Sequence, residues 1–373
     1  MRNRLRLASA VALAALASVA LLQRPAAAAQ DRPTVAKDSI QIRAWTNNSY
    51  KGNYDVWSWV PEMKFRVNGP IPSGSQLYVE FTQPGGTAPW VKFDCSTEET
   101  QKGYWYETGD CGGRQIEDKS TTAVGPVNFS IKMRNELAGG GDQTLYTGRA
   151  KVAKTLTNEV GPKAAQKFVY YVDQDWNLPI GYIYYTRDDV YGWDYPTFNV
   201  AFWVRGEPGR FEPHIFYKGQ EVGKVFLDGE QIGKPSCDPK VEIGTTHFVT
   251  DSLPQKAKWA RVECTFYTVK RWDKTDEGRG QPNTKDMFKT AANPGEYEVK
   301  ILRNNKLARS IKFNVLPDGR LDWSITDANK LGNDRGITPV AVLGDQDGAW
   351  DKTAWKTDAF YGNPLTGFTP PPQ

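Results

Sequence analysis

The chain has 373 residues, with 47 Lys and Arg against 43 Asp and Glu, and 12% of its residues are aromatic. Residues 1–29 contain four arginines and no acidic residue, so the rest of the chain has 43 basic and 43 acidic side chains. Without surplus positive charge, the chain lacks the electrostatic footprint of a nucleic-acid-binding protein. Its length exceeds what one ordinary core supports and predicts two domains.

Residues 1–29 predict a secretory signal peptide of the bacterial type. Three arginines precede an apolar run from Leu7 to Leu22, and four alanines end the segment at Ala29. A basic start, a short apolar run and an Ala-x-Ala site are typical of export. The run is short for a membrane span, which needs about 20 apolar residues; a retained anchor helix is the alternative. We expect a mature protein in the periplasm or outside the cell, without a transmembrane span.

Residues 30–160 are expected to form the first β domain. The segment from Gly125 to Leu137 alternates apolar and polar residues, with Phe129 and Ile131 on its apolar face. This period of two is typical of a strand with one buried face. A return strand is expected from Tyr146 to Val152.

Residues 161–195 are expected to connect the domains and are unusually rich in aromatic residues. In one interpretation, these rings pack in a core or a domain interface. In the other, they form an exposed platform that stacks on sugar rings or on a partner protein. The candidate ligand-binding residues of the second interpretation include two tryptophans from the C-terminal part of the chain: Trp176, Tyr182, Tyr184, Trp193, Trp350 and Trp355.

Residues 196–317 are expected to form the second β domain, and its clearest element is a hairpin from Gly295 to Val315. Apolar residues alternate with polar ones on both arms, and Asn304-Asn305 lies between the arms. Asparagine tolerates the positive φ that a tight hairpin turn requires.

The two predicted domains repeat the same order of features. The segment from Gly125 to Leu137 aligns without a gap on the segment from Gly295 to Leu307, and Phe65-Arg-Val-Asn-Gly69 corresponds to Phe202-Trp-Val-Arg-Gly206. We interpret this order as an internal duplication. Two unrelated β domains with similar hairpins are the alternative.

The four cysteines fall two to each predicted domain. In an exported protein this favours the disulfides Cys95–Cys111 and Cys237–Cys264, although four cysteines formally allow three connectivities. Each should contribute on the order of 3 kcal/mol by the chain-entropy estimate. The sequence thus predicts an all-β protein of two tandem antiparallel β-sandwich domains. At the level of fold class, the pattern resembles immunoglobulin-like sandwiches.

Residues 318–373 are expected to form an extension that lies against the body of the protein, because their aromatic side chains are too apolar for a free tail. Asp345, Asp347 and Asp351 surround a glycine with a spacing that partly resembles a calcium-binding loop. Asp173-Gln-Asp175 repeats part of this motif. Acidic turn residues that bond their own backbone are the alternative to calcium, and no other cofactor is expected.

No catalytic motif accompanies these features. The two histidines, His214 and His247, lie in neither a zinc-protease motif nor Gly-x-Ser-x-Gly. A glycosidase needs only two facing carboxylates, and the candidates beside the aromatic stretch are Asp173, Asp175, Asp188 and Asp189.

We therefore expect an exported, non-catalytic binding or structural protein of the bacterial cell envelope or the extracellular space. An envelope protein or a polysaccharide is the expected partner. The first alternative is a carbohydrate-binding protein that uses exposed Trp and Tyr side chains, and the second is a polysaccharide hydrolase. The sequence does not set the oligomeric state.

Overall fold

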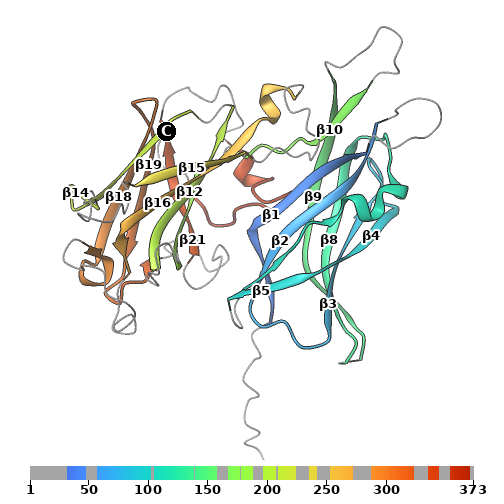
Figure 1. Ribbon diagram of the computed structural model, residues 1–373, viewed down its shortest axis with the longest axis horizontal. Coiled ribbons are helices and arrows are strands. Elements are labelled where there is room, and N and C mark those ends of the chain that lie inside the picture. Colours follow the sequence, from blue (N-terminus) through green and yellow to red (C-terminus); the bar gives the residue numbers. More distant parts are fainter. Residues whose placement is uncertain are drawn as a thin grey trace, which may run out of the picture.

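The described residues of the computed structural model form two β units side by side (Figure 1). They contain β-strands and short 3-10 helices, which confirms the all-β prediction. No helix among them is long and apolar enough to cross a membrane. The described ranges are 32–47, 57–101, 105–137, 139–157, 167–176, 178–187, 196–206, 209–223, 235–241, 253–271, 287–322, 335–343 and 353–369. Residues 1–29, the expected signal peptide, lie outside them.

The first unit consists of two five-stranded sheets around one core. The strands of one sheet, in spatial order, are β1 (Thr34–Asn47), β2 (Ser58–Asn68), β6 (Trp105–Thr108) and β5 (Thr97–Gln101), with β7 (Cys111–Gly112) also on β2. The strands of the other are β10 (Phe168–Val172), β9 (Asp142–Leu156), β8 (Gly125–Asn135), β3 (Ser75–Thr82) and β4 (Pro89–Cys95). Alternate residues of both sheets, such as Phe65, Phe81 and Phe129, meet in the core.

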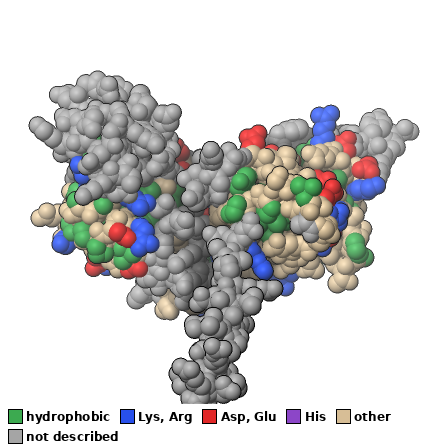
Figure 2. All heavy atoms as spheres, turned by 90° about the horizontal axis from the view of Figure 1, so that it is seen from below, with side chains coloured by type: hydrophobic (Ala, Val, Ile, Leu, Met, Phe, Trp, Pro, Cys, Tyr) green, Lys and Arg blue, Asp and Glu red, His purple; other side chains and the backbone are tan. Residues whose placement is uncertain are grey.

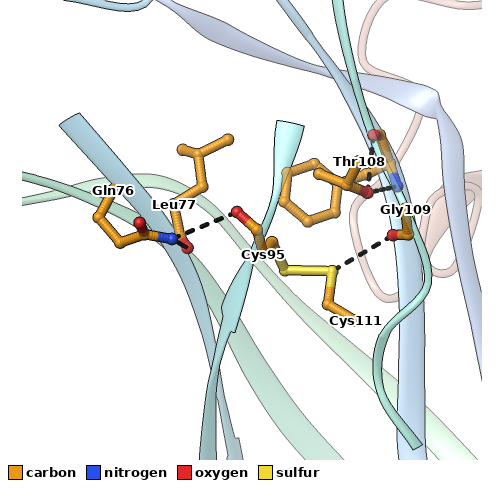
Figure 3. The surroundings of a disulfide bond; sticks show 7 residues. Gln76, Leu77, Cys95, Thr108, Gly109 and Cys111 are labelled. Atoms are coloured by element: carbon orange, nitrogen blue, oxygen red, sulfur yellow. Dashed lines mark hydrogen bonds between the residues drawn. A yellow bond between two sulfur atoms is a disulfide. The ribbon is translucent and has the colours of Figure 1, made fainter. Parts of the chain in front are cut away.

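The expected disulfide Cys95–Cys111 joins the two sheets of the first unit (Figure 3). Cys95 ends β4, and Cys111 lies on β7, which pairs with β2 of the opposite sheet. Gln76 supports this region, because its Nε2 donates to the carbonyl oxygens of Leu77 and Cys95. The 3-10 helix η1 (Gly113–Lys119) follows directly.

The second unit is one eleven-stranded sheet that curls around its own core into a nearly closed barrel (Figure 1). Its main strands, in spatial order, are β14 (Gln220–Val222), β13 (Phe211–Tyr217), β18 (Gly295–Arg303), β19 (Lys306–Val315), β21 (Arg335–Val342), β11 (Ile180–Arg187), β12 (Pro196–Arg205), β16 (Trp259–Lys270) and β15 (Ser236–Val241). Short strands β17 (Phe288–Lys289) and β20 (Leu321–Asp322) pair with β16 and β19. The second unit thus differs from a sandwich of two separate sheets, because β21 pairs with β11 and joins them.

The remaining 3-10 helices of the described chain are η4 (Gln255–Ala257), η7 (Thr290–Ala292) and η9 (Ala354–Lys356). The second expected disulfide, Cys237–Cys264, links neighbouring strands of this unit. The two cysteines lie directly opposite each other on β15 and β16, with a Cα–Cα distance of 4.0 Å.

Both predicted hairpins are present. In the second unit, β18 and β19 flank Asn304 and Asn305, whose φ angles of 51° and 64° are the positive values that the turn requires. In the first unit, β8 and β9 form the equivalent pair, and the expected return strand lies within β9.

The order of strand pairing is the same in both units. In one sheet, β4-β3-β8-β9-β10 matches β14-β13-β18-β19-β21; in the other, β1-β2-β6-β5 matches β11-β12-β16-β15. The units differ at the place where the first strand of the unit meets its last strand, which is called the seam below. The last strand of the second unit, β21, pairs with its first strand, β11, whereas β10 and β1 lie near each other without pairing.

Two predicted boundaries change. The described parts of residues 161–195 are not a linker, because they include β10 of the first unit and β11 of the second. Residues 318–373 are not wholly an extension, because β21 belongs to the second sheet. The described residues 353–369, called the C-terminal segment below, lie beyond β21 and belong to none of the three sheets. Their apolar side chains, including Phe360 and Leu365, share a third core with β11, β12 and the start of β16.

Candidate functional site

Strands β4, β3, β8 and β9 present two rows of side chains on the outer face of the first unit. Their registers place the members of the first row opposite one another: Lys92, Glu80, Ser130 and Thr147. In the second row, Asn128 lies opposite Arg149, and its backbone N–H donates to Thr82 Oγ1 at 3.0 Å. Because alternate residues of a strand face opposite sides, both rows point away from the core.

The two rows line an open groove of about 750 Å³. Between them, Phe81, Val91 and Phe129 also line the groove, and their side chains belong to the core. The C-terminal segment forms one end of the groove with Tyr361, Gly362 and Asn363. The groove therefore runs across four strands and a fifth chain segment, within the range of about 300–1,000 Å³ that small-molecule sites occupy.

The C-terminal segment lies on the part of the β9 edge that β10 leaves free. β10 pairs with β9 only between Val152 and Leu156. Before that point, the Arg149 N–H donates to the Tyr361 carbonyl oxygen at 2.7 Å, and Asn363 Nδ2 donates to the Thr147 carbonyl oxygen at 2.9 Å. The segment thus supplies hydrogen bonds that a strand would otherwise make at an open sheet edge.

Tyr361 also reaches the opposite sheet. Its hydroxyl accepts a hydrogen bond from the backbone N–H of Ile42 on β1 at 3.1 Å, and its ring is 1% exposed. The ring contacts Phe129 edge-on, with centroids 5.9 Å apart. Tyr361 therefore fills the seam between β9 and β1.

Gly148 makes room for this contact. A Cβ at Gly148 would meet the Phe129 ring and lie 3.1 Å from the Tyr361 carbonyl oxygen. Beside it, the Tyr146 hydroxyl donates to the Phe360 carbonyl oxygen at 2.6 Å and accepts from Asn363 Nδ2 at 2.9 Å. Burial raises the pKa of Tyr146 well above its ordinary value, so this hydroxyl remains a neutral donor.

Trp90 lies at the other end of the groove. Phe81 pairs with Val91 and Thr82 pairs with Pro89, so Trp90 is the extra residue of a β-bulge. Its side chain is half-buried, and its Nε1–H donates to the Lys119 carbonyl oxygen at 3.0 Å. The indole is therefore held in one orientation.

Each ionised side chain that lines the groove already has an oppositely charged partner. Glu80 Oε2 lies 2.6 Å from Lys132 Nζ, and Glu80 Oε1 lies 3.8 Å from Lys92 Nζ. Arg149 Nη2 lies 3.1 Å from Asp358 Oδ1 of the C-terminal segment. With these partners included, three cationic side chains accompany two carboxylates, so the groove combines paired charges with neutral hydroxyl and amide groups.

The predicted aromatic residues do not gather at this groove. Tyr182 and Tyr184 are 1% and 2% exposed and belong to the third core. The expectation that they form an exposed platform is therefore wrong, because β11 lies inside a sheet with the C-terminal segment against it.

The predicted tryptophans are half-buried or lie outside the described residues. Trp176 stacks on Trp203 with ring centroids 4.9 Å apart and packs against the first and third cores. Trp355 contacts the Phe368 ring edge-on at 5.3 Å. Trp193 and Trp350 lie outside the described part of the chain.

Asp173-Gln-Asp175 lies at the contact between the units. Asp173 Oδ2 lies 3.3 Å from Lys151 Nζ of the first unit and 3.2 Å from Lys256 Nζ of the second. Asp175 forms an ion pair with Arg205 at 3.3 Å. These two carboxylates bind cationic side chains of the protein itself, which argues against a calcium site in this copy of the motif.

The second copy of the motif, with the calcium candidates Asp345, Asp347 and Asp351, lies outside the described residues, as do Asp188, Asp189 and His247. Within the described ranges, no group of three or more His, Cys, Asp and Glu side chains is arranged to hold a metal ion. His214 lies on β13, with its Nδ1 2.8 Å from Glu221 Oε1.

Sequence reasoning missed the groove and its two ends, Trp90 and Tyr361. The alternation in residues 125–137 places Asn128 and Ser130 on the polar face of the strand, between the apolar residues that face the core. The signal on the polar face was present. Its neighbours on β3, β4 and β9 follow only from the strand registers.

The comparisons with known proteins leave the family open. No family model and no curated protein matches the chain. Among solved structures, it is similar to the uncharacterized protein lmo2446 from Listeria monocytogenes EGD-e, solved in complex with glucose, magnesium and calcium. The identity is 11%, the TM-score is 0.17, and the match covers 69% of this chain and 20% of that chain. The chain thus spans about a fifth of that protein, and a similarity this low assigns neither fold nor function.

Proposed function

We propose that the protein is an exported, non-catalytic binding protein of the bacterial cell envelope or extracellular space, and that its ligand lies in the cross-strand groove of the first unit. The observation that carries the proposal is the groove itself, with Trp90 at one end and Tyr361 at the other. Concave sites of this size with a few convergent polar groups are the usual form of ligand-binding sites.

The proposed export rests on the N-terminal sequence and on the two disulfides. Disulfides persist in oxidising compartments outside the cytosol, and both cysteine pairs are bonded. Mass spectrometry of the protein secreted with its own leader tests this step. We expect a mature chain that begins at Gln30.

The proposed origin is the duplication of one immunoglobulin-like sandwich unit. It is supported by the shared order of strand pairing and by the equivalent hairpins, which begin at Gly125 and Gly295 with φ angles of 131° and 127°. In this proposal the second unit departed from the sandwich form when its first and last strands paired.

The mixed surface charge and the lining favour binding over the alternatives. Figure 2 shows basic and acidic side chains interspersed on the described part of the face seen from below, as expected for a protein that does not bind nucleic acid. Glu80 is the one acidic side chain among the lining residues, and a glycosidase needs two. A hydrolase at this groove is therefore disfavoured.

The test uses a groove-filling variant of the mature protein. Thr147 is exposed on the groove floor, so Thr147→Trp should occlude the ligand and leave the core intact. Asn314→Trp, at an exposed position on β19 of the second unit, is the matched control. We would measure co-sedimentation with insoluble cell envelopes and binding to solubilised envelope polysaccharides and proteins.

We expect binding by the wild type and the control, and its loss in Thr147→Trp. Equal binding by all three proteins would place the interaction elsewhere and overturn the assignment of the groove. An absence of binding by the wild type would leave the structural alternative, a non-binding envelope component.

A further inference from the structure

We propose that the ligand of the groove is a neutral carbohydrate chain that lies across the strands and stacks on Trp90. This inference rests on the proposed binding function and names the ligand class of the same site. It uses none of the aromatic residues that the sequence suggested for sugar binding. Four observations carry it: the direction of the groove, its neutral polar groups, its paired charges and the fixed indole at one end.

The direction of the groove excludes a peptide that extends the sheet. Such a peptide runs along an edge strand and pairs with its backbone. Here the floor crosses β4, β3, β8 and β9, three strand spacings or about 14 Å. The backbone groups of β3 and β8 are used on both sides by their neighbours. A ligand that lies across these strands must be recognised by side chains.

The side chains of the floor are suited to hydroxyl groups. Asn128 and Thr147 are exposed and Ser130 is half-buried, and their side chains make no hydrogen bond to another described residue. An amide and two hydroxyls offer both donors and acceptors. Sugar hydroxyls also donate and accept, so a carbohydrate can pair with all three, whereas an apolar ligand would leave them unsatisfied.

The charges of the groove favour a neutral ligand. Arg149 and Glu80 are already paired with Asp358, Lys92 and Lys132. Lys92 Nζ also lies 3.9 Å from the centroid of the Tyr78 ring, and burial raises the pKa of this phenol to about 12, so the ring remains neutral. An anionic ligand would compete with Asp358 at Arg149 and with Glu80 at Lys92, and a cationic ligand would compete with the lysines at Glu80. A neutral chain competes with none of these pairs.

Trp90 lines the groove, but its half-buried side chain also packs against the first core, so a ligand meets only the part of the indole that remains exposed. Its ring contacts Trp59 edge-on, with centroids 5.1 Å apart, and its Nε1–H is bound to the Lys119 carbonyl oxygen. The indole therefore already has a fixed orientation before a ligand binds. An apolar sugar face can pack on such a ring, while the sugar hydroxyls reach Asn128 and Ser130.

The experiment measures binding of purified probes to the mature, oxidised protein by isothermal titration calorimetry. The neutral probes are hexasaccharides of α-1,4-linked glucose, β-1,4-linked glucose and β-1,4-linked N-acetylglucosamine. The charged and non-sugar probes are hexagalacturonate and a neutral extended decapeptide. The variants are Asn128→Ala and Trp90→Ala, with Asn314→Ala as the exposed-asparagine control. Thermal unfolding of each variant shows that it is folded.

We expect at least one neutral hexasaccharide to bind to the wild type. Its affinity for Asn128→Ala should be about tenfold lower, because this variant loses one hydrogen bond to the sugar. Binding to Trp90→Ala should fall further, and Asn314→Ala should bind as the wild type does. If Trp90→Ala fails to fold, Asn128→Ala and Thr147→Ala, both at exposed positions, decide the question.

The outcomes separate this inference from the function on which it rests. In one outcome, hexagalacturonate or the peptide binds, no neutral sugar binds, and the binding is weaker in Asn128→Ala. This outcome would overturn the neutral-carbohydrate assignment but would still support the groove as the binding site. Neutral-sugar binding that is unchanged in Asn128→Ala and in Trp90→Ala would overturn the site itself. Failure of every neutral hexasaccharide to bind would also overturn the inference, whereas envelope binding that Thr147→Trp abolishes would still support the groove.

Discussion

The two units share one order of strand pairing, yet only the second closes its sheet. At the seam of the second unit, β21 pairs with β11 along five residues of each strand. At the corresponding seam of the first unit, β10 is short, and Tyr361 of the C-terminal segment bonds to β9 with its carbonyl oxygen and to β1 with its hydroxyl. Backbone groups of buried edges need partners, and the two units supply them in different ways.

This difference gives the first unit a feature that the second does not share. Phe129 on β8 lies opposite Gly148, whereas the equivalent Val299 on β18 lies opposite Ile311. The glycine leaves space for Tyr361, and the residues after Tyr361 become the end wall of the groove. In the described part of the chain, the segment that closes the seam of the first unit thus also forms one end of the groove.

The largest expected effect comes from Tyr361→Ala. The substitution removes a buried aromatic ring and leaves the Ile42 N–H without its partner, at a cost of about 3–5 kcal/mol. We expect the loss mainly in the first unit. Native-state hydrogen exchange measures it, because a two-unit protein need not unfold in one step.

Tyr361→Phe serves as the control for this prediction. It keeps the ring and removes only the hydroxyl, so it should cost about 1–3 kcal/mol. Equal loss of protection in both units of Tyr361→Ala would contradict the view that this residue completes the first unit.

Removal of the disulfides is expected to have the next largest effect. The loops closed by Cys95–Cys111 and Cys237–Cys264 contain 16 and 27 residues. The chain-entropy estimate gives about 3 kcal/mol for each. Cys95→Ala/Cys111→Ala should destabilise the first unit and Cys237→Ala/Cys264→Ala the second, as measured by urea unfolding with hydrogen exchange. A loss in the opposite unit would show that the units do not unfold separately.

Gly148→Ala should have a smaller effect, about 1–3 kcal/mol, which is typical of overpacking. The added methyl would meet Phe129 and push Tyr361 from the β9 edge. Gly141→Ala is the matched control, because nothing lies within 4 Å of its added Cβ. Urea unfolding of both variants tests the prediction. Equal stabilities would mean that the seam accommodates a side chain.

The smallest expected effect concerns pH and Glu62 of β2. Burial, followed by the nearby Asp110, raises the pKa of Glu62, whose equivalent in the second unit is the neutral Asn199. The folded chain therefore holds this proton more tightly than the unfolded chain. The resulting stabilisation is complete below about pH 4.3 and is lost as pH rises through the folded pKa.

Glu62→Gln should remove this contribution, because it makes the position neutral at every pH. The free energy of unfolding of the first unit, measured between about pH 4 and pH 7, should then fall less with rising pH than in the wild type. Identical pH profiles would show that Glu62 is not held protonated by the fold.

Much of the architecture was determined by local sequence. Alternation in residues 125–137 and 295–315 set the hairpin strands, and Asn304-Asn305 set a turn with positive φ. Both disulfides could be predicted from the positions of the cysteines, because two cysteines fall in each unit and each disulfide lies within one unit. These features depend on residues near each other in the chain or on spacing alone.

Only the tertiary structure decided the seams and the groove. Period-two alternation predicts that Tyr182 and Tyr184 lie on the same face of their strand. It does not predict that the C-terminal segment covers this face. Likewise, Trp90 and Tyr361 lie at the two ends of one groove although 271 positions separate them in the sequence. Their proximity depends on strand register and on one edge left free by a short β10, and neither property is encoded by the periodicity of a single segment.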